Sequence, residues 1–318
     1  MDNNTVKVVL FASSSIVIPT LNQLLQSQHL AGVVLSDRVD EDSMQLAQQL
    51  SQANIPHIRY QVEQPENITH QIAHQIEAWQ ANTGLIFTFG HKLPTSVLGV
   101  FANGLFNLHA SALPQYRGAM PLYWQIRNRE SEGCLSILKV EEKLDSGDIM
   151  LQQRFPLHPL DTLNSFGHVM AEHSPGFVLQ FIGQLQDNTL TATVQILKTE
   201  KALAAPMPTQ QDLIINWQTM KGAEIAAMAR AGNPLFNGAM IVWHQSFVGL
   251  LQATVVDHPT FGVPAGTVLL VGEPEGLIVA TIDGALRLDV LTITEGVFSG
   301  LAFAERFGLD AGAQFDVL

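Results

Sequence analysis

The chain has 318 residues, 47% of them apolar, with 24 glycines and 15 prolines, which predicts a globular protein of about two domains. Its formal charge of −13 argues against broad, sequence-independent binding to nucleic acid, because phosphate neutralisation needs clustered Lys and Arg. The one cysteine, Cys134, excludes a disulfide framework and a thiolate zinc site within one chain. Since Cys134 lies in an apolar run, we interpret it as a small core residue.

No apolar run reaches the length that spans a bilayer, and no membrane partner is expected. Residues 8–18 behind Lys7 imitate a signal peptide only weakly, because the single positive charge and Asp2 make a poor start to one. The chain beyond residue 18 continues as a folded pattern, so we expect a cytoplasmic protein.

The first ninety residues alternate between strand-like and helix-like segments. Strands are expected at residues 6–11, 30–35, 56–60 and 85–89, and helices around residues 19–25, 44–53 and 69–79. This alternation predicts an α/β fold with a mostly parallel sheet covered on both faces. Ligands of such sheets bind at the carboxyl ends of the strands.

The turn after the first strand reads Ala12-Ser13-Ser14-Ser15, without the glycines that let a pyrophosphate approach a helix N-terminus. A bound NAD is therefore not expected. Helix capping is the default role of serines at such a place, with a small anion as the alternative.

The stretch that carries the most chemical information begins with Gly104-Leu105-Phe106-Asn107-Leu108-His109, which reads as a buried strand. Side chains alternate between faces along a strand, so Asn107 and His109 share one face. The loop 111–118 comes immediately afterwards and contains Pro114 and Gly118. An amide and an imidazole side by side at a strand end indicate a site rather than a core.

Further along, a helix is expected at 119–129, strands at 134–140 and 149–155, and a turn at 141–148 between them. Residues 163–185 have helical spacing, with Ser174-Pro175-Gly176 as an interruption. Because proline removes a backbone donor, Pro175 is expected to kink or restart this helix.

The composition changes near residue 200, where residues 202–208 are rich in Ala and Pro and suit a linker. A helix around 223–230 and short strands at 240–243, 246–256, 267–271, 276–281 and 285–291 predict a small barrel. We therefore expect one domain at 1–203, with its linker from about 186, and a second at 204–318.

Three features stand together: Asn107-x-His109, the loop Ser111 to Gly118, and Leu144-Asp145-Ser146-Gly147-Asp148. In this order they resemble the methionyl-tRNA formyltransferase family, within the wider group of enzymes that use 10-formyltetrahydrofolate. Residues 89–94, 215–217 and 230–234 extend the resemblance over most of the chain. It implies a Rossmann-like formyltransferase domain followed by a small OB-like β-barrel domain.

The resemblance implies that Asn107, His109 and Asp145 are catalytic. When an amine attacks a formyl carbon, charge develops on the formyl oxygen, to which Asn107 and a protonated His109 can donate. Losing one such donor costs about 3 kcal/mol, or a hundredfold or more in rate. Asp145 would orient His109, favour its charged form and relay a proton through water.

The implied donor is 10-formyltetrahydrofolate, and no metal is expected. The folate side would be formed by Phe87, Phe89, Gly90, Leu93, Val140 and Leu144. The acceptor side would be formed by Ser13, Ser14, Ser111, Tyr116, Arg117 and Gly118.

Taken singly, each motif has a structural explanation. Asn107 and His109 alone would be a hydrogen-bonded pair at a strand end, and residues 145–148 alone would be a turn. Tyr116 and Arg117 alone would be surface residues of a loop. Their order and context together favour catalysis.

The acceptor side departs from the family. Residues 35–42 are short and mostly acidic where members that act on tRNA carry a long basic loop. From residue 205 onward, four basic residues face eleven acidic ones, a net charge of −7, whereas a tRNA-binding barrel needs a basic face. The turn at 12–16 also lacks the Gly-Thr-Pro-Asp/Glu pattern of the family.

The leading hypothesis is therefore a formyltransferase whose acceptor is a small amine, such as an amino sugar nucleotide or an amino acid derivative. Three alternatives stay open: a genuine methionyl-tRNA formyltransferase, a formyltetrahydrofolate hydrolase that uses water as acceptor, and a non-catalytic folate-binding protein.

Overall fold

The computed structural model describes residues 5–60, 65–196 and 203–316. It divides into two compact units. Unit 1 comprises Met1–Pro121, Glu132–Phe155 and Gly167–Pro206, and unit 2 comprises Leu122–Ser131, Pro156–Phe166 and Met207–Leu318. The domain boundary at 203/204 stays a prediction, and residues 197–202 of the expected linker lie outside the described residues.

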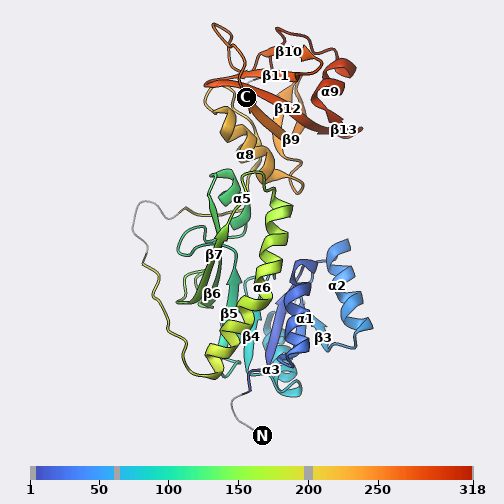
Figure 1. The fold of residues 1–318 in the computed structure, drawn as a ribbon. Helices are drawn as coiled ribbons and strands as arrows, with labels where there is room; N and C mark the ends of the chain where they lie inside the picture. Colours follow the sequence, from blue (N-terminus) through green and yellow to red (C-terminus); the bar gives the residue numbers. More distant parts are fainter. Residues whose placement is uncertain (1–4, 61–64, 197–202, 317–318) are drawn as a thin grey trace. The chain divides into compact units, whose positions relative to one another are not determined.

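The first half of the chain alternates strands and helices as expected (Figure 1). Its strands are β1 (Val8–Ala12), β2 (Leu30–Leu35), β3 (His57–Arg59), β4 (Thr83–Ile86), β5 (Gly104–His109), β6 (Glu132–Lys139) and β7 (Ile149–Pro156). Its helices are η1 (Ser15–Val17), α1 (Ile18–Gln26), α2 (Glu41–Gln52), α3 (Pro65–Ala78), α4 (Thr95–Leu98), α5 (Pro121–Arg127) and α6 (Leu163–Gln186).

The seven strands form one sheet in the order β3-β2-β1-β4-β5-β6-β7. The pairs from β3 to β5 are parallel, with Leu10 opposite both Val33 and Leu85, and Leu85 opposite Phe106. Strand β6 runs antiparallel to β5. The order reverses next to β1, and such switch points place ligands at the carboxyl ends of the strands. The mostly parallel sheet is confirmed.

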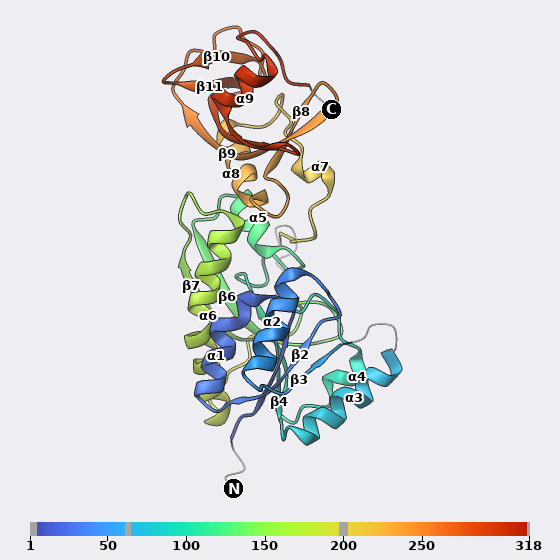
Figure 2. The same cartoon turned by 90° about the vertical axis from the view of Figure 1, so that its right-hand side faces the viewer.

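Helices cover both faces of this sheet, with α1 and α6 on one face and α3 and α4 on the other (Figure 2). All five residues of β1 are buried, as a central parallel strand requires. On the α3 side, Val9 and Phe11 of β1 pack with Ile72 and Ile76 of α3 and with Val97 of α4.

Helix α6 continues through Pro175. Of the two expected effects of this proline, a kink or a restart, the restart was therefore wrong, and the kink stays a prediction. A proline has no N–H for the carbonyl four residues earlier, which is that of Ala171. The Ser174 hydroxyl donates to the Ala171 carbonyl at 3.0 Å instead. Ser174 is fully buried and also bonds the Thr20 hydroxyl of α1 at 2.6 Å. The neighbouring serine thus replaces the contact that the proline cannot make.

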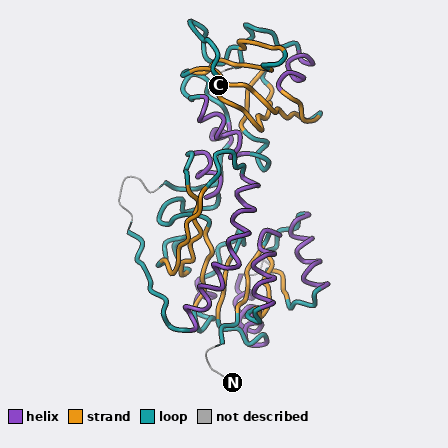
Figure 3. The backbone as a smooth tube through the Cα atoms, viewed as in Figure 1, coloured by secondary structure: helices purple, strands orange, loops and turns teal. Residues whose placement is uncertain are grey.

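The later part of the chain forms an antiparallel sheet in the order β10-β11-β12-β9-β8, with β13 paired to β12. Figure 3 shows its strands as the orange segments near the C-terminus. Its strands are β8 (Ala239–Trp243), β9 (Ser246–Val256), β10 (Val268–Gly272), β11 (Gly276–Thr281), β12 (Gly284–Ile293) and β13 (Gly296–Ser299). Its helices are α7 (Gln210–Leu213), α8 (Gly222–Gly232) and α9 (Gly300–Phe307). The antiparallel second sheet expected for the OB-like domain is present.

Several short elements were absent from the sequence prediction, namely α4, α7, β13 and α9. Strand β4 also ends at Ile86 rather than at Phe89, because the chain turns at Thr88, whose φ is +62°. Among the helices of the described residues, none has the length and apolar character needed to cross a membrane.

Candidate active site

The candidate site lies where β5 ends. Strand β5 places the half-buried Asn107 and the buried His109, which is 6% exposed, two residues apart on one strand. Antiparallel pairing sets Asn107 opposite Leu138 and His109 opposite Ser136 of β6. The turn after β6 brings Asp145 back to the same place, within reach of both side chains.

Asp145 is the centre of this cluster. Its Oδ1 accepts a hydrogen bond from Asn107 Nδ2 at 3.2 Å, and its Oδ2 accepts one from the Gly118 N–H at 2.9 Å. The same Oδ2 lies 3.8 Å from His109 Nδ1. Asp145 is 7% exposed and has a φ of +51°, a conformation that residues other than glycine rarely adopt. Two of the predicted residues, Asn107 and His109, therefore meet around the buried carboxylate of the third, Asp145.

His109 also contacts the loop that comes after its strand. Its Nε2 lies 2.8 Å from the Tyr116 carbonyl oxygen, which can only accept a hydrogen bond. An N–H at Nε2 therefore donates to this carbonyl, and Nδ1 is the nitrogen that faces Asp145. This orientation holds the ring between the carboxylate and the loop.

The loop 111–118 is folded tightly onto itself and onto β6. The Ser111 hydroxyl donates to the Gln115 carbonyl at 2.7 Å, and the Ser136 hydroxyl donates to the Ser111 carbonyl. Of the predicted acceptor residues here, Ser111 and Tyr116 are buried, and Arg117 and Gly118 are half-buried. Tyr116 and Gly118 have φ values of +58° and +129°. The site thus rests on a loop with a closely defined backbone.

The predicted folate-side residues occupy different environments. Phe89 and Leu93 belong to the core on the α3 side, and Phe87 is also buried. Val140 is partly buried against the same core. Gly90 is exposed, with a φ of +77°, and Leu144 is 59% exposed beside Asp145. Gly90 and Leu144 are the exposed members of this set.

The serines of the first turn have local partners. A hydrogen bond joins the Ser13 hydroxyl to the Thr88 carbonyl and so ties the ends of β1 and β4 together. Ser14 caps η1 by accepting from the Ile16 N–H. The Ser15 N–H donates to both oxygens of Asp42, at 3.1 and 3.2 Å. A carboxylate of the chain itself therefore occupies the place that the sequence offered to a small anion.

An aromatic cluster beside the β4 loop was not singled out from the sequence. His91 stacks on Tyr60 at 5.8 Å between ring centroids, and its Nε2 lies 2.6 Å from Asp37 Oδ1. Burial, and after it the Asp37 carboxylate, raise the pKa of the Tyr60 phenol. His91 lies within the stretch 89–94 that carries the family resemblance. Its position in that stretch was the feature of the sequence that could have identified it.

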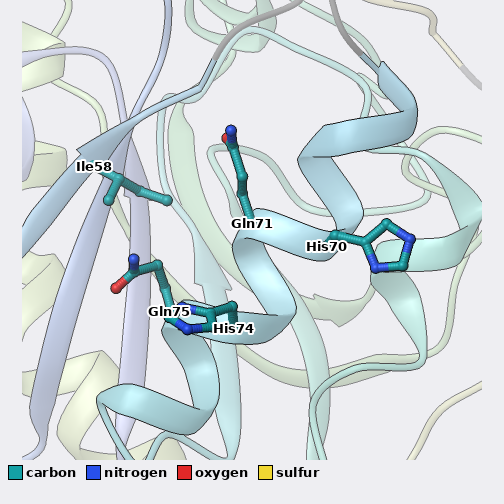
Figure 4. A pocket seen from close by; sticks show the side chains of 5 residues that line it. All are labelled: Ile58, His70, Gln71, His74 and Gln75. Carbon is teal, nitrogen blue, oxygen red and sulfur yellow. The ribbon is translucent and has the colours of Figure 1, made fainter.

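A surface hollow of about 560 Å³ lies elsewhere in unit 1, next to β3 and α3 (Figure 4). Its lining is Ile58, His70, Gln71, His74 and Gln75, and the rings of His70 and His74 do not face each other. None of these residues was predicted to act. Within the described ranges, no group of three or more potential metal ligands is present. Convergent polar contacts occur around Asp145 instead, and we place the candidate site there.

Comparison with known proteins identifies the family. Residues 6–182 match the formyl transferase domain, and residues 208–305 match the formyl transferase C-terminal domain. The chain belongs to the formyl transferase family. It is accordingly an enzyme that transfers formyl groups, and the family and fold class expected from the sequence are confirmed.

Curated formyl transferases align with most of the chain. The methionyl-tRNA formyltransferase of Synechococcus sp. (strain JA-3-3Ab) is 29% identical over 296 residues, which cover 89% of each protein. That of Coxiella burnetii (strain CbuK_Q154) is 27% identical over 303 residues, which cover 91% of each. These formyl transferases are homologues of the chain at a divergent level of identity.

Solved formyl transferases share the fold. The N-formyltransferase of Helicobacter canadensis, in complex with folinic acid and dTDP-3-aminofucose, has a TM-score of 0.65 at 18% identity and covers 88% of this chain and 98% of its own. WlaRD, a sugar 3N-formyl transferase, has a TM-score of 0.63 at 16% identity and coverages of 89% and 96%. HypX from Aquifex aeolicus with tetrahydrofolic acid also has a TM-score of 0.63, over 99% of this chain and 49% of HypX.

Proposed function

We propose that this formyl transferase moves a formyl group from 10-formyltetrahydrofolate to the amino group of a small molecule. The observation that carries the proposal is the meeting of Asn107 and His109 around the buried carboxylate of Asp145. A folate donor is supported by the family, and by solved neighbours that bind folinic acid or tetrahydrofolic acid.

In the proposed reaction, the acceptor nitrogen attacks the formyl carbon and the bond from that carbon to N10 of the donor then breaks. The amine loses one proton and N10 gains one, so tetrahydrofolate is the second product. Asp145 is assigned the transfer of the amine proton, directly or through one water. Its buried, hydrogen-bonded position makes it a fixed acceptor at that step.

Asn107 and His109 are assigned to the formyl oxygen, on which charge develops. The amide nitrogen of Asn107 carries two N–H groups, so its bond to Asp145 leaves a second one for the oxygen. The Nε2–H of His109 donates to the Tyr116 carbonyl in the structure. In the same mechanism it donates to the formyl oxygen instead. Preorganised donors of this kind contribute more in the transition state than in the ground state.

The acidic character of two regions of the chain favours a small acceptor over tRNA. The segment 35–42 carries one cation, Arg38, which pairs with Asp40, and its Asp37 faces His91. Residues from 205 onward carry eleven acidic side chains and four basic ones. Sugar N-formyltransferases among the solved neighbours support an amino sugar nucleotide as the acceptor class.

The second candidate is methionyl-tRNA, which the names of the curated relatives favour. An assay of tetrahydrofolate release from 10-formyltetrahydrofolate separates the candidates, with dTDP-amino sugars, free amino acids, methionyl-tRNA or water as acceptor. The proposal predicts release that depends on a small amine. Release that only methionyl-tRNA stimulates would replace the small acceptor by tRNA, and release that no amine stimulates would indicate a hydrolase.

A further inference from the structure

Gln195 links two loops of the candidate site through its side chain. Its Oε1 accepts from Arg117 Nε at 3.0 Å and from Arg117 Nη2 at 2.6 Å. Its Nε2 donates to the carbonyl oxygens of Asp145 at 3.0 Å and of Gly147 at 2.6 Å. All four residues belong to unit 1. One side chain therefore holds the loop 111–118 and the turn 144–148 together.

This contact uses the full hydrogen-bonding capacity of a carboxamide, which has one oxygen that accepts twice and one nitrogen that donates twice. A glutamate of the same size keeps the acceptor but loses both donors, and it would place a carboxylate against two carbonyl oxygens. An alanine loses all four bonds. The geometry at Gln195 is thus specific to an amide.

The backbone holds Gln195 in place. Two residues earlier, Thr193 exchanges two hydrogen bonds with Ile149, the first residue of β7, at 2.9 and 2.8 Å. Gln195 itself is half-buried. Because β7 comes directly after the turn 144–148, the segment around Gln195 is fixed relative to the carbonyls that it binds.

The two linked loops carry the groups that face His109. Asp145, held through its carbonyl, approaches Nδ1, and Tyr116, the residue before Arg117, accepts from Nε2. Both residues have a positive φ, +51° for Asp145 and +58° for Tyr116, so their backbones need support from neighbours. Gln195 supports the turn directly and supports the loop through Arg117.

We propose that Gln195 is a positioning residue for formyl transfer: it fixes Asp145 and the Tyr116 carbonyl on either side of His109. The inference rests on the proposed function and adds a residue to it. Gln195 acts on the ring of His109 through main-chain atoms of the two loops. Its loss should therefore lower the rate of the chemical step more than the affinity for the donor.

The kinetic test compares Gln195→Glu and Gln195→Ala with Gln48→Ala, which changes a glutamine of α2 far from the site in the sequence. The probes are 10-formyltetrahydrofolate with dTDP-3-aminofucose or with methionyl-tRNA. We expect kcat to fall by about tenfold to a hundredfold in both Gln195 variants, as a displacement near 1 Å would cause. The KM for the donor should change by a smaller factor than kcat, because Gln195 bonds the turn at Asp145 and Gly147 and not at Leu144. Unchanged kcat in Gln195→Glu would overturn the proposal.

Combining Gln195→Ala with Asp145→Asn tests whether Gln195 acts through Asp145. If it does, the double variant should be no slower in a single turnover than Asp145→Asn alone, since coupled sites are not additive. Independent effects that multiply would contradict the assignment. A residue with only a general structural role would give that multiplicative result.

A readout without substrate separates this inference from the proposed function. The ¹⁵N resonances of the His109 ring respond to the groups that face Nδ1 and Nε2. They should shift in both Gln195 variants and remain in place in Gln48→Ala, with folded stability checked by thermal unfolding. Unshifted His109 resonances would overturn the role of Gln195. An enzyme that transfers no formyl group but shows these shifts would contradict the proposed function alone.

Discussion

The backbone N–H of Gly118 donates to Asp145 Oδ2 at 2.9 Å, although the two residues are 27 positions apart in the chain. Gly118 has a φ of +129°, and a Cβ there would lie 2.5 Å from the Ala205 carbonyl oxygen. The loop can therefore direct this N–H at the carboxylate only with glycine at that position. Through this bond, the loop after β5 orients the acid that faces His109.

Replacing Asp145 by asparagine removes the charge and turns one of its two acceptors into a donor. The new amide donor would face another donor, either the Gly118 N–H or Asn107 Nδ2. The cluster would therefore lose one hydrogen bond in addition to the carboxylate that accepts the proton. We expect kcat to fall by about a hundredfold or more. Single-turnover kinetics measure the change, and binding of folinic acid, followed by calorimetry, should stay within about twofold of the wild type. A comparable loss of folinic acid binding would assign Asp145 to the folate site instead.

Gly147→Ala tests the packing of the turn that carries Asp145. A Cβ at Gly147 would lie 1.9 Å from the Lys139 carbonyl oxygen, so the turn would have to move away from β6. We expect a destabilisation of about 1–3 kcal/mol, measured by urea unfolding.

Gly183→Ala in α6 is the matched control, because a Cβ there meets nothing within 4 Å. Alanine favours a helix over glycine, so this variant should be more stable by up to about 1 kcal/mol. Equal effects of the two substitutions would show that the close approach at Gly147 does not exist.

Ser174→Ala tests how α6 continues through Pro175. The change leaves the Ala171 carbonyl and the buried Thr20 hydroxyl without this partner. The expected cost is about 1–3 kcal/mol, since buried polar groups lose a bond. Ser51→Ala, at an exposed hydroxyl that bonds the Ala47 carbonyl within α2, should change stability by less than about 0.5 kcal/mol in the same urea experiment.

Alkaline pH should act on Tyr123. Burial is the largest cause that raises the pKa of its phenol to about 12, and its hydroxyl donates to the Asp212 carbonyl at 3.2 Å. The unfolded phenol titrates at about 10, so the contribution of Tyr123 to stability should be constant below that pH and be lost as pH rises toward 12. Tyr123→Phe should lose less stability over this interval. Parallel losses in both proteins would contradict the assignment.

Local pattern predicted part of the centre of the site. The two-residue period of a strand placed Asn107 and His109 on one face, whereas the residues after β6 indicated only a turn, and the family resemblance assigned Asp145 to the site. The alternation of strands and helices likewise predicted the parallel sheet. These features depend on neighbours in the sequence, which a single chain displays directly.

Long-range contacts were not predictable in the same way. Gln195 lies 50 positions from Asp145 and 78 from Arg117, and a glutamine after a helix carries no signal of such a role. The hydrogen bond from the Ser15 N–H to the Asp42 carboxylate was not predictable for the same reason. At Pro175, the rule for proline was sound, but its effect was offset by the hydroxyl of the preceding residue. Each case needed knowledge of which side chain meets which backbone atom.

The most direct test of the proposed function traces the formyl carbon itself. Donor carrying a ¹³C-labelled formyl group is mixed with wild-type enzyme or with His109→Ala, each in the presence of dTDP-3-aminofucose. Mass spectrometry then detects the labelled N-formyl product. We predict labelled product from the wild type and a rate lower by about a hundredfold or more in His109→Ala. Equal rates in the two proteins would contradict the proposed role of His109 at the formyl oxygen.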